Sequence, residues 1–121
     1  MRAIIIDDEV NAISALKGVL EEYFKEITIV ATATHIVEGA ALVNEYHPHL
    51  VFIDINMPVY SGFDLKQFLL DDTPDFHAVF VTGHSDYALK AYEHNATDYL
   101  LKPVKAEEIE RLLRKITLLS S

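Results

Sequence analysis

Cysteine is absent from this 121-residue sequence, which excludes disulfide bonds, thiolate metal sites and cysteine nucleophiles together. No apolar run approaches the roughly 18 residues of a membrane span, and nothing after Met1 resembles a signal peptide. Basic side chains are scarce, since 10 of them stand against 19 acidic ones for a formal net charge of −9. That charge repels nucleic acid and anionic membrane surfaces. We therefore expect a cytoplasmic protein that contacts neither directly.

Hydrophobic residues, by contrast, are plentiful and make up 50% of the chain. A chain of this length and composition can bury one real core. No internal repeat, low-complexity tract or Pro/Gly-rich linker marks a boundary. We expect a single domain over residues 1–121, either alone or as the N-terminal part of a longer protein.

Strand-like and helix-like segments alternate along the chain. Short apolar runs lie at 3–6, 27–31, 50–53, 78–81 and 99–101. Their β-branched content and lack of apolar/polar alternation indicate strands of a parallel sheet, buried on both faces. Between them, apolar residues recur at helical spacing at positions 13, 16, 20 and 24, at 36, 40 and 43, and at 109, 112, 113 and 116. Two further helices, with weaker patterns, are expected at Phe63–Leu70 and Tyr87–His94. Five such alternations predict right-handed β-α-β crossovers, with helices on both sides of the sheet.

Polar side chains gather where the predicted strands end. Asp7, Asp8 and Glu9 follow the first run, Asp54 ends the third, Thr82 ends the fourth, and Lys102 and Pro103 follow the fifth. In open α/β sheets, ligands bind beyond the carboxyl ends of the strands. The sequence therefore predicts that three acids, Asp7, Asp8 and Asp54, converge with a hydroxyl group and an ammonium group on one pocket.

The chemistry of this set points to a divalent cation and a phosphoryl group. Asp7, Asp8 and Asp54 at close range would raise one another's pKa values unless a cation neutralised them. Carboxylate oxygens suit Mg²⁺ better than Ca²⁺ or Mn²⁺ in this setting, and Mg²⁺ works beside phosphate groups. Asp54 could then be the nucleophile in a phosphoryl transfer, with the Lys102 ammonium and the Thr82 hydroxyl on the phosphoryl oxygens.

Along almost its full length, the chain resembles the receiver domain of bacterial two-component response regulators. The matching residues are Asp7-Asp8-Glu9, Asp54 through Pro58 with Gly62, Val81-Thr82, and Tyr99 through Pro103. The resemblance implies a flavodoxin-like (βα)5 doubly wound sandwich, with five parallel strands in the order 2-1-3-4-5. It also implies a phosphoacceptor switch that catalyses only its own phosphorylation and dephosphorylation, and is not an enzyme acting on a separate substrate.

The same resemblance assigns a role to each site residue. Asp54 accepts the phosphoryl group from the phosphohistidine of a sensor histidine kinase. Mg²⁺ is held by Asp8, Asp54 and the backbone carbonyl of Asn56, with Asp7 acting indirectly, and Lys102 clamps the phosphate before a cis bond to Pro103. Thr82 and Tyr99 form a switch pair, and Asn56 and His84 set the lifetime of the phosphorylated state.

The output is expected on the fourth helix, fifth strand and fifth helix, roughly Tyr87 to Leu119. Phosphorylation would change this surface, which would then mediate homodimerisation or contact with an effector, with a phosphorylation-dependent homodimer expected. The segments Tyr87–Tyr92 and Asp98–Pro103 are most similar to the branch whose receivers precede a LytTR-type DNA-binding domain. Such a domain would lie outside this chain, and the implied output is control of transcription.

Three other functions fit parts of this pattern. A haloacid-dehalogenase-like aspartyl-phosphate hydrolase also uses an Asp after a buried strand, but it needs a second Asp where this chain has Asn56. A flavodoxin needs a phosphate-cradling Ser/Thr/Gly loop after the first strand, where this chain has Asp7-Asp8-Glu9. A degenerate receiver acting only as an interaction module is disfavoured because every residue needed for the chemistry is present.

Simpler roles exist for individual residues. Asp7 and Asp8 alone would be read as helix caps, and Gly62 as a turn residue with unusual backbone angles. His47 and His49 form a possible metal pair, but no third ligand is evident.

Overall fold

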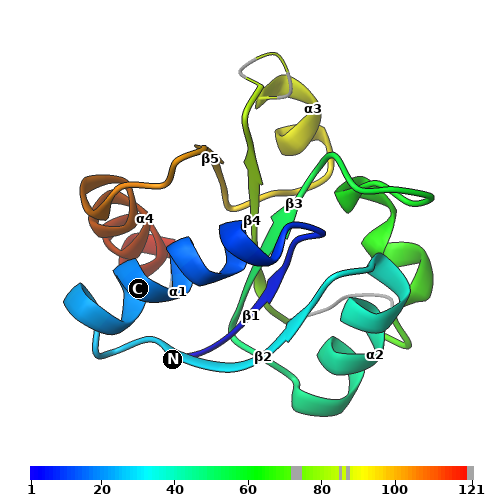
Figure 1. Cartoon of the computed structure of the whole chain (residues 1–121), viewed down its shortest axis with the longest axis horizontal. Helices are drawn as coiled ribbons and strands as arrows, with labels where there is room; N and C mark the ends of the chain where they lie inside the picture. Colours follow the sequence, from blue (N-terminus) through cyan, green and yellow to red (C-terminus); the bar gives the residue numbers. More distant parts are fainter. Residues whose placement is uncertain (72–74, 85, 87, 120–121) are drawn as a thin grey trace.

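The chain folds around one parallel sheet. The computed structural model describes residues 1–71, 75–84, 86 and 88–119, and within them five strands pair in the order β2-β1-β3-β4-β5 (Figure 1). The strands are β1 (Arg2–Ile6), β2 (Thr28–Ala33), β3 (Leu50–Asp54), β4 (His77–Thr82) and β5 (Asp98–Leu101). All neighbouring pairs are parallel. This confirms the predicted flavodoxin-like class and strand order.

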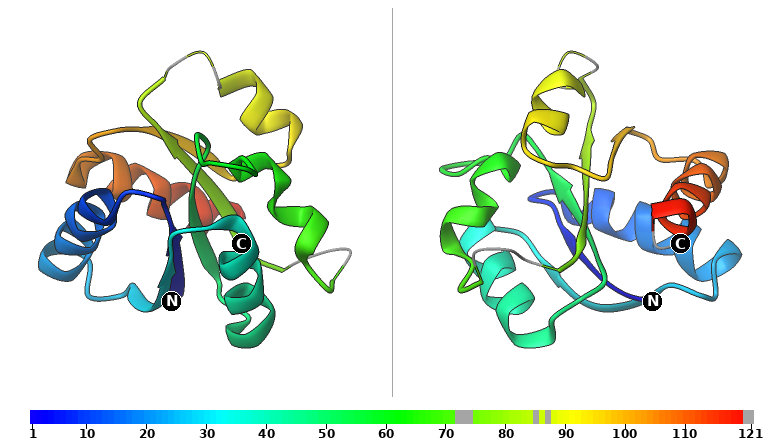
Figure 2. Two further views of the ribbon diagram at one scale, coloured as in Figure 1. Left: turned by 45° about the vertical axis from the view of Figure 1, so that its right-hand side comes forward. Right: turned by 180° about the vertical axis from the view of Figure 1, so that it is seen from behind.

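Helices cover both faces of the sheet, as Figure 1 and the two turned views in Figure 2 show. On one face lie α1 (Val10–Tyr23) and α4 (Ala106–Leu119), and on the other lie α2 (Ile36–Tyr46), the 3-10 helix η1 (Gly62–Phe68) and α3 (Ala88–Glu93). None of the helices in the described ranges is both long enough and apolar enough to cross a membrane.

Each face of the sheet has its own hydrophobic cluster, because successive side chains of a strand point to opposite faces. In β1, Ile5 packs towards α1 and α4, whereas Ile4 and Ile6 pack towards α2 and η1. Phe52 and Ile53 of β3 divide in the same way, and both are 1% exposed. Burying a side chain of this size contributes about 1.5–3 kcal/mol. The two clusters hold the central strands in register.

The edge strands depart from the sequence-based prediction. Burial on both faces was expected for every strand, and it holds for β3 and nearly all of β1. In β2, however, Thr28 is exposed and of its six residues only Ala33 is buried. In β5, Leu101 is 40% exposed. The prediction was wrong here because β2 and β5 form the two edges of the sheet, where helices cover the faces only in part.

The third helical segment is a 3-10 helix, and it covers Gly62–Phe68 instead of the expected Phe63–Leu70. It begins with a capping box, in which the Ser61 hydroxyl accepts from the Phe63 N–H and the Asp64 carboxylate accepts from the Ser61 N–H. At its far end, the Asn44 side chain donates to the Phe68 carbonyl. The fourth helix, expected at Tyr87–His94, is observed as Ala88–Glu93, and Tyr87 lies outside the described residues.

Gly62 does not have the unusual backbone angles predicted for it, because no described glycine has a positive φ. A Cβ on Gly62 would instead lie 2.4 Å from the backbone carbonyl oxygen of Asp54 and 2.9 Å from the Ile53 side chain. Its N–H donates to the Ile55 carbonyl at 3.0 Å. Glycine is therefore required by the close approach of η1 to the end of β3.

Candidate functional site

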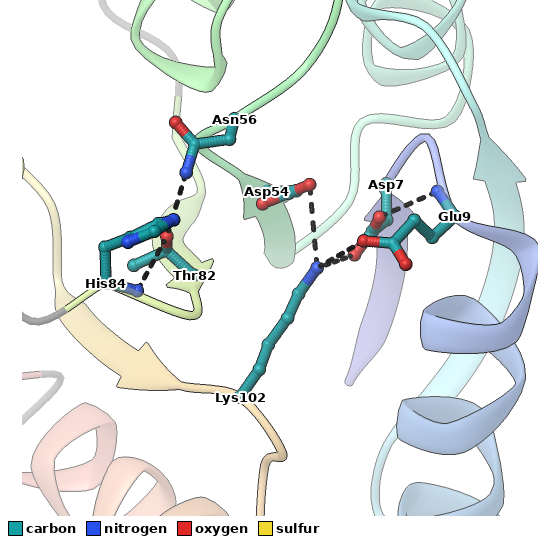
Figure 3. Close-up of polar contacts among 7 residues, drawn as sticks. All are labelled: Asp7, Glu9, Asp54, Asn56, Thr82, His84 and Lys102. Carbon is teal, nitrogen blue, oxygen red and sulfur yellow. Dashed lines mark hydrogen bonds and ion pairs between the residues drawn. The ribbon is translucent and has the colours of Figure 1, made fainter.

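The predicted polar side chains come together at the carboxyl edge of the sheet (Figure 3). Asp54 is the last residue of β3 and Thr82 the last of β4, while Asp7 directly follows β1. These three residues are buried, with exposures of 4%, 0% and 5% respectively. Lys102 follows β5 and extends between Asp7 and Asp54 (Figure 3). A parallel sheet thus gathers residues far apart in sequence at one edge.

Lys102 is the cation at the centre of this arrangement. Its Nζ lies 2.8 Å from Asp7 Oδ2, 3.6 Å from Asp54 Oδ2 and 3.9 Å from Glu9 Oε1. Its backbone N–H donates to the Thr82 carbonyl at 2.8 Å, which joins the ends of β4 and β5. The Lys102–Pro103 peptide bond is cis, as the family resemblance implies.

Burial and crowded acids alter the acidity of the nucleophile candidate. Burial first, and then the charge of Asp7, raise the pKa of Asp54 from 3.8 to about 7, although Lys102 acts to lower it. For Lys102, burial acts to lower the pKa, but the hydrogen bond with Asp7 and the charge of Asp54 outweigh it and raise the pKa. One lysine therefore does not neutralise the acids, and an additional cation would favour the ionised form of Asp54.

The acidic residues after β1 fit a divalent cation. Asp7, Asp8 and Glu9 each offer a carboxylate oxygen, and these atoms lie within 4.8 Å of one another. Asp8 Oδ1 is buried and has no hydrogen-bond partner among the described residues. A buried carboxylate oxygen without a donor is costly unless a cation binds it. An all-oxygen set of this kind suits Mg²⁺.

Glu9 was not among the site residues predicted from the sequence, although it belongs to the Asp-Asp-Glu run. It occupies the N-cap position of α1, yet its side chain forms no capping hydrogen bond. The backbone N–H of Glu9 donates to Asp7 Oδ1 at 2.9 Å. The Glu9 carboxylate is therefore available to the acidic cluster, and the signal in the sequence was its direct adjacency to the two aspartates.

A second group of polar residues lies on the other side of Asp54, around Thr82 (Figure 3). The Thr82 hydroxyl accepts from the His84 N–H at 3.3 Å and from the Asn56 side-chain amide at 3.5 Å. The hydroxyl of the half-buried Tyr99 donates to the His84 carbonyl. The structure thus connects the predicted switch pair, Thr82 and Tyr99, through the backbone of His84.

Comparison with known proteins identifies the family. Residues 3–114 match the response regulator receiver domain, so the chain belongs to this family. It is a receiver domain of a two-component response regulator, and hence a signalling switch. The haloacid-dehalogenase, flavodoxin and degenerate-receiver alternatives are not favoured by these matches.

Individual relatives agree with this assignment. The chain is 41% identical over 119 residues to an uncharacterized response regulatory protein of Vibrio cholerae, covering 95% of this chain and 49% of that protein. It is 36% identical over 116 residues to the transcriptional regulatory protein BtsR of Escherichia coli K12, covering 96% and 48%. It is 36% identical over 115 residues to the sensory transduction protein LytT of Enterococcus faecalis, covering 95% and 47%. The chain spans about half the length of these curated relatives.

Solved structures share the fold. The response regulatory domain of mrkE from Klebsiella pneumoniae superposes with a TM-score of 0.82 at 28% identity, covering 98% of this chain and 96% of that one. The predicted relationship to the LytTR-type branch is confirmed by the relatives, which include LytT.

Proposed function

We propose that Asp54 accepts a phosphoryl group from the phosphohistidine of a sensor histidine kinase in a Mg²⁺-dependent reaction. The observation that carries this proposal is the Asp54 carboxylate, 4% exposed at the end of β3, with the Lys102 ammonium 3.6 Å away. Such a carboxylate can act as a nucleophile, and such an ammonium can hold a phosphoryl oxygen.

In this reaction an Asp54 carboxylate oxygen attacks phosphorus, and an acyl-phosphate O–P bond forms. The P–N bond to the donor imidazole breaks, and its electron pair stays on that nitrogen, which then takes a proton. The Lys102 ammonium, which lies 2.8 Å from Asp7 Oδ2, would also bind the transferred phosphoryl oxygens. The Thr82 hydroxyl would donate to another of them.

Mg²⁺ is the proposed cofactor. Asp8, Asp54 and the Asn56 backbone carbonyl would ligate it, Asp7 would act through water or hydrogen bonds, and Glu9 would add negative charge beside it. The bound cation would neutralise charge on the phosphoryl oxygens. The orphaned Asp8 Oδ1 supports this assignment.

Intact-mass measurement after incubation with a small phosphodonor and Mg²⁺ tests the reaction. We expect one acid-labile, hydroxylamine-sensitive phosphoryl group on the wild type and on the control Asp75→Asn, whose side chain is exposed. Asp54→Asn should not be modified, and a chelator should abolish the modification. Equal phosphorylation of Asp54→Asn and wild type would refute the assignment.

We further propose that Thr82 and Tyr99 relay phosphorylation to the surface formed by α3, β5 and α4. If Thr82 turns its hydroxyl to the phosphoryl group, the hydrogen bonds from His84 and Asn56 must rearrange. The His84 carbonyl that receives the Tyr99 hydroxyl would move with them. Ser85 and Tyr87, expected to belong to this loop and surface, lie outside the described residues.

Amide exchange and sedimentation with and without beryllofluoride test the relay. We expect changed protection across residues 88–119 in the wild type, with a shift towards a homodimer. Inverting the ratio of active to inactive receiver from 1:99 to 99:1 needs about 5.5 kcal/mol of differential interaction. One hydrogen bond from Thr82 and one movement of the Tyr99 ring would supply only part of this, so we expect a partial shift. An identical response in Thr82→Ala would remove Thr82 from the relay.

His84 and Asn56 are proposed to set the lifetime of the acyl phosphate, since both contact Thr82 beside Asp54. Substituting His84 by Ala or Glu should change the dephosphorylation rate at unchanged Mg²⁺ affinity. If the acyl phosphate of every His84 variant is hydrolysed at the wild-type rate, His84 has no role in setting the lifetime.

The proposed output is control of transcription in the cytoplasm, through a LytTR-type DNA-binding domain on the same polypeptide. The relatives named as transcriptional and sensory transduction proteins are about twice the length of this chain, which supports an additional domain. Reading the gene beyond Ser121 tests this. A stop codon there would refute an attached output domain.

A further inference from the structure

A cleft of about 480 Å³ opens beside the acidic site, between α1 and the connection from β5 to α4. Its floor is formed by the sheet residues Ile5, Phe52 and Val81, which are 1–5% exposed. Its volume lies within the range of about 300–1,000 Å³ typical of small-molecule sites. Most of its lining is apolar, and phosphoryl transfer uses none of these apolar residues.

The side of the cleft formed by α1 is lined by short side chains. Ala12, Ala15 and Val19 are spaced by three and four residues, so they follow one another on a single face of the helix. Ala15 is exposed, whereas Ala12 and Val19 are half-buried. Pro103 and Val104 form the opposite rim. Larger residues on α1 would fill this space, and the short ones leave an apolar surface that a flat or branched group can cover.

One end of the cleft is strongly acidic. Asp7 and Asp54 line it, at 5% and 4% exposure, together with Lys102. The oxygens of Asp8 and Glu9 lie within 4.8 Å of that of Asp7. Asp7, Asp54 and Glu9 each lie within 3.9 Å of the Lys102 ammonium, and Asp8 adds a further carboxylate beside Asp7, within a chain of net charge −9. Without bound Mg²⁺, a positively charged ligand group is complementary to this end, whereas a negatively charged group would be repelled.

We propose that this cleft binds a small amphipathic amine, with its apolar body against Ala15 and Val104 and its ammonium group at Asp7 and Asp54. This binding site goes beyond phosphoryl transfer, and it requires no phosphodonor. Because the ammonium group would use the carboxylates that also fit Mg²⁺, the amine and the metal compete. The receiver would then be sensitive to such an amine through its metal occupancy.

Titration of the full chain with tryptamine, followed by amide NMR without phosphodonor, tests the proposal. We expect saturable shifts confined to the first half of α1, the end of β1 and residues 102–104. Indole-3-propionate, which carries a carboxylate in place of the ammonium group, should bind at least about tenfold more weakly. Saturating Mg²⁺ should weaken tryptamine binding several-fold.

A matched pair of variants separates the cleft from general surface binding. Ala15→Phe places a ring in the cleft at an exposed helix position, so the fold should tolerate it. Ala41→Phe makes the same change at an exposed position of α2 that does not line the cleft. We expect Ala15→Phe to weaken tryptamine at least about tenfold and Ala41→Phe to leave it unchanged.

Absence of saturable binding, equal binding by Ala15→Phe and wild type, or equal affinity for the anionic indole would each overturn the proposal. Insensitivity to Mg²⁺ would also overturn it. Phosphorylation of Asp54 is measured separately by mass, so a failure here leaves that result intact, and the reverse also holds.

Discussion

The backbone carbonyl of Asp54 lies directly against Gly62, so that a single added methyl group on Gly62 would come within 2.4 Å of the carbonyl oxygen. The contact joins the start of η1 to the end of β3, the strand that presents the phosphoacceptor candidate. Backbone atoms cannot swing aside as a flexible side chain can. The position of Asp54 therefore depends on the absence of a side chain eight residues later.

Gly62→Ala is expected to destabilise the protein by about 1–3 kcal/mol, because overpacking against backbone forces a shift of η1 or β3. Urea unfolding measures the change. The control is Gly18→Ala on α1, where an added Cβ meets nothing within 4 Å. It should be neutral or stabilise the helix by up to about 1 kcal/mol. Equal stability of the two variants would contradict the proposed contact.

Stability without metal is expected to fall as pH rises. Because the pKa of Asp54 is raised from 3.8 to about 7 in the folded protein, folding favours its protonated form. The corresponding stability is fully present below about pH 4 and is lost as pH rises through about 7. Thermal unfolding in a chelator across this range measures the loss, and saturating Mg²⁺ should reduce it.

Asp54→Asn should remove most of this pH dependence and stabilise the metal-free protein at pH 8 by about 1–2 kcal/mol, because a buried charge is lost among like charges. Glu45→Gln, which alters an exposed carboxylate on α2, is the matched control and should behave like wild type. A pH profile for Asp54→Asn that follows wild type would assign the dependence to other groups.

Lys102→Met is expected to raise Mg²⁺ affinity while lowering the phosphorylation yield. The Lys102 ammonium lies 2.8 Å from Asp7 and 3.6 Å from Asp54, where it competes with a cation for the same carboxylates. Calorimetric titration should show that Lys102→Met binds Mg²⁺ several-fold more tightly than the wild type. Unchanged affinity would mean that the lysine and the metal occupy independent positions.

An ion pair between a buried carboxylate and a half-exposed arginine links β5 to α4. The Asp98 carboxylate is 1% exposed, and Arg111 Nη1 lies 3.2 Å from its Oδ2. Arg111→Ala should cost about 1–3 kcal/mol, since it leaves a buried carboxylate without its cation, although the half-exposed arginine reduces the effect. Arg114→Ala removes an exposed pair with Glu110 on the same helix and should cost below about 0.5 kcal/mol. Equal costs in urea unfolding would mean that burial of Asp98 is unimportant.

The strands and the residues at their ends could be predicted from the sequence because both depend on local pattern. Short β-branched runs such as 50–53 have few alternatives to a buried strand, and parallel strands necessarily bring their ends to one edge. Asp7, Asp54, Thr82 and Lys102 therefore meet as expected.

What the sequence did not reveal depends on contacts between distant segments. Gly62 appeared to be a turn residue because its neighbour in space, Asp54, is not adjacent in sequence. The exposure of β2 follows from its place at the edge of the sheet, and a run of apolar residues carries no information on that place. The Glu9 carboxylate belongs to the acidic cluster because its side chain forms no capping hydrogen bond with α1. The sequence alone does not show which hydrogen bonds a residue at the N-cap position forms.

The two hydrophobic clusters lie on opposite faces of the sheet and share no side chain. Substitutions at Leu16 and at Val43 should therefore have additive effects on stability, since sites without common partners rarely couple. Such independence lets sequence drift repack one layer while the other stays fixed. The α1 side could then diverge among related chains to suit different ligands or partners, while packing on the α2 side keeps β3 and its terminal Asp54 in position.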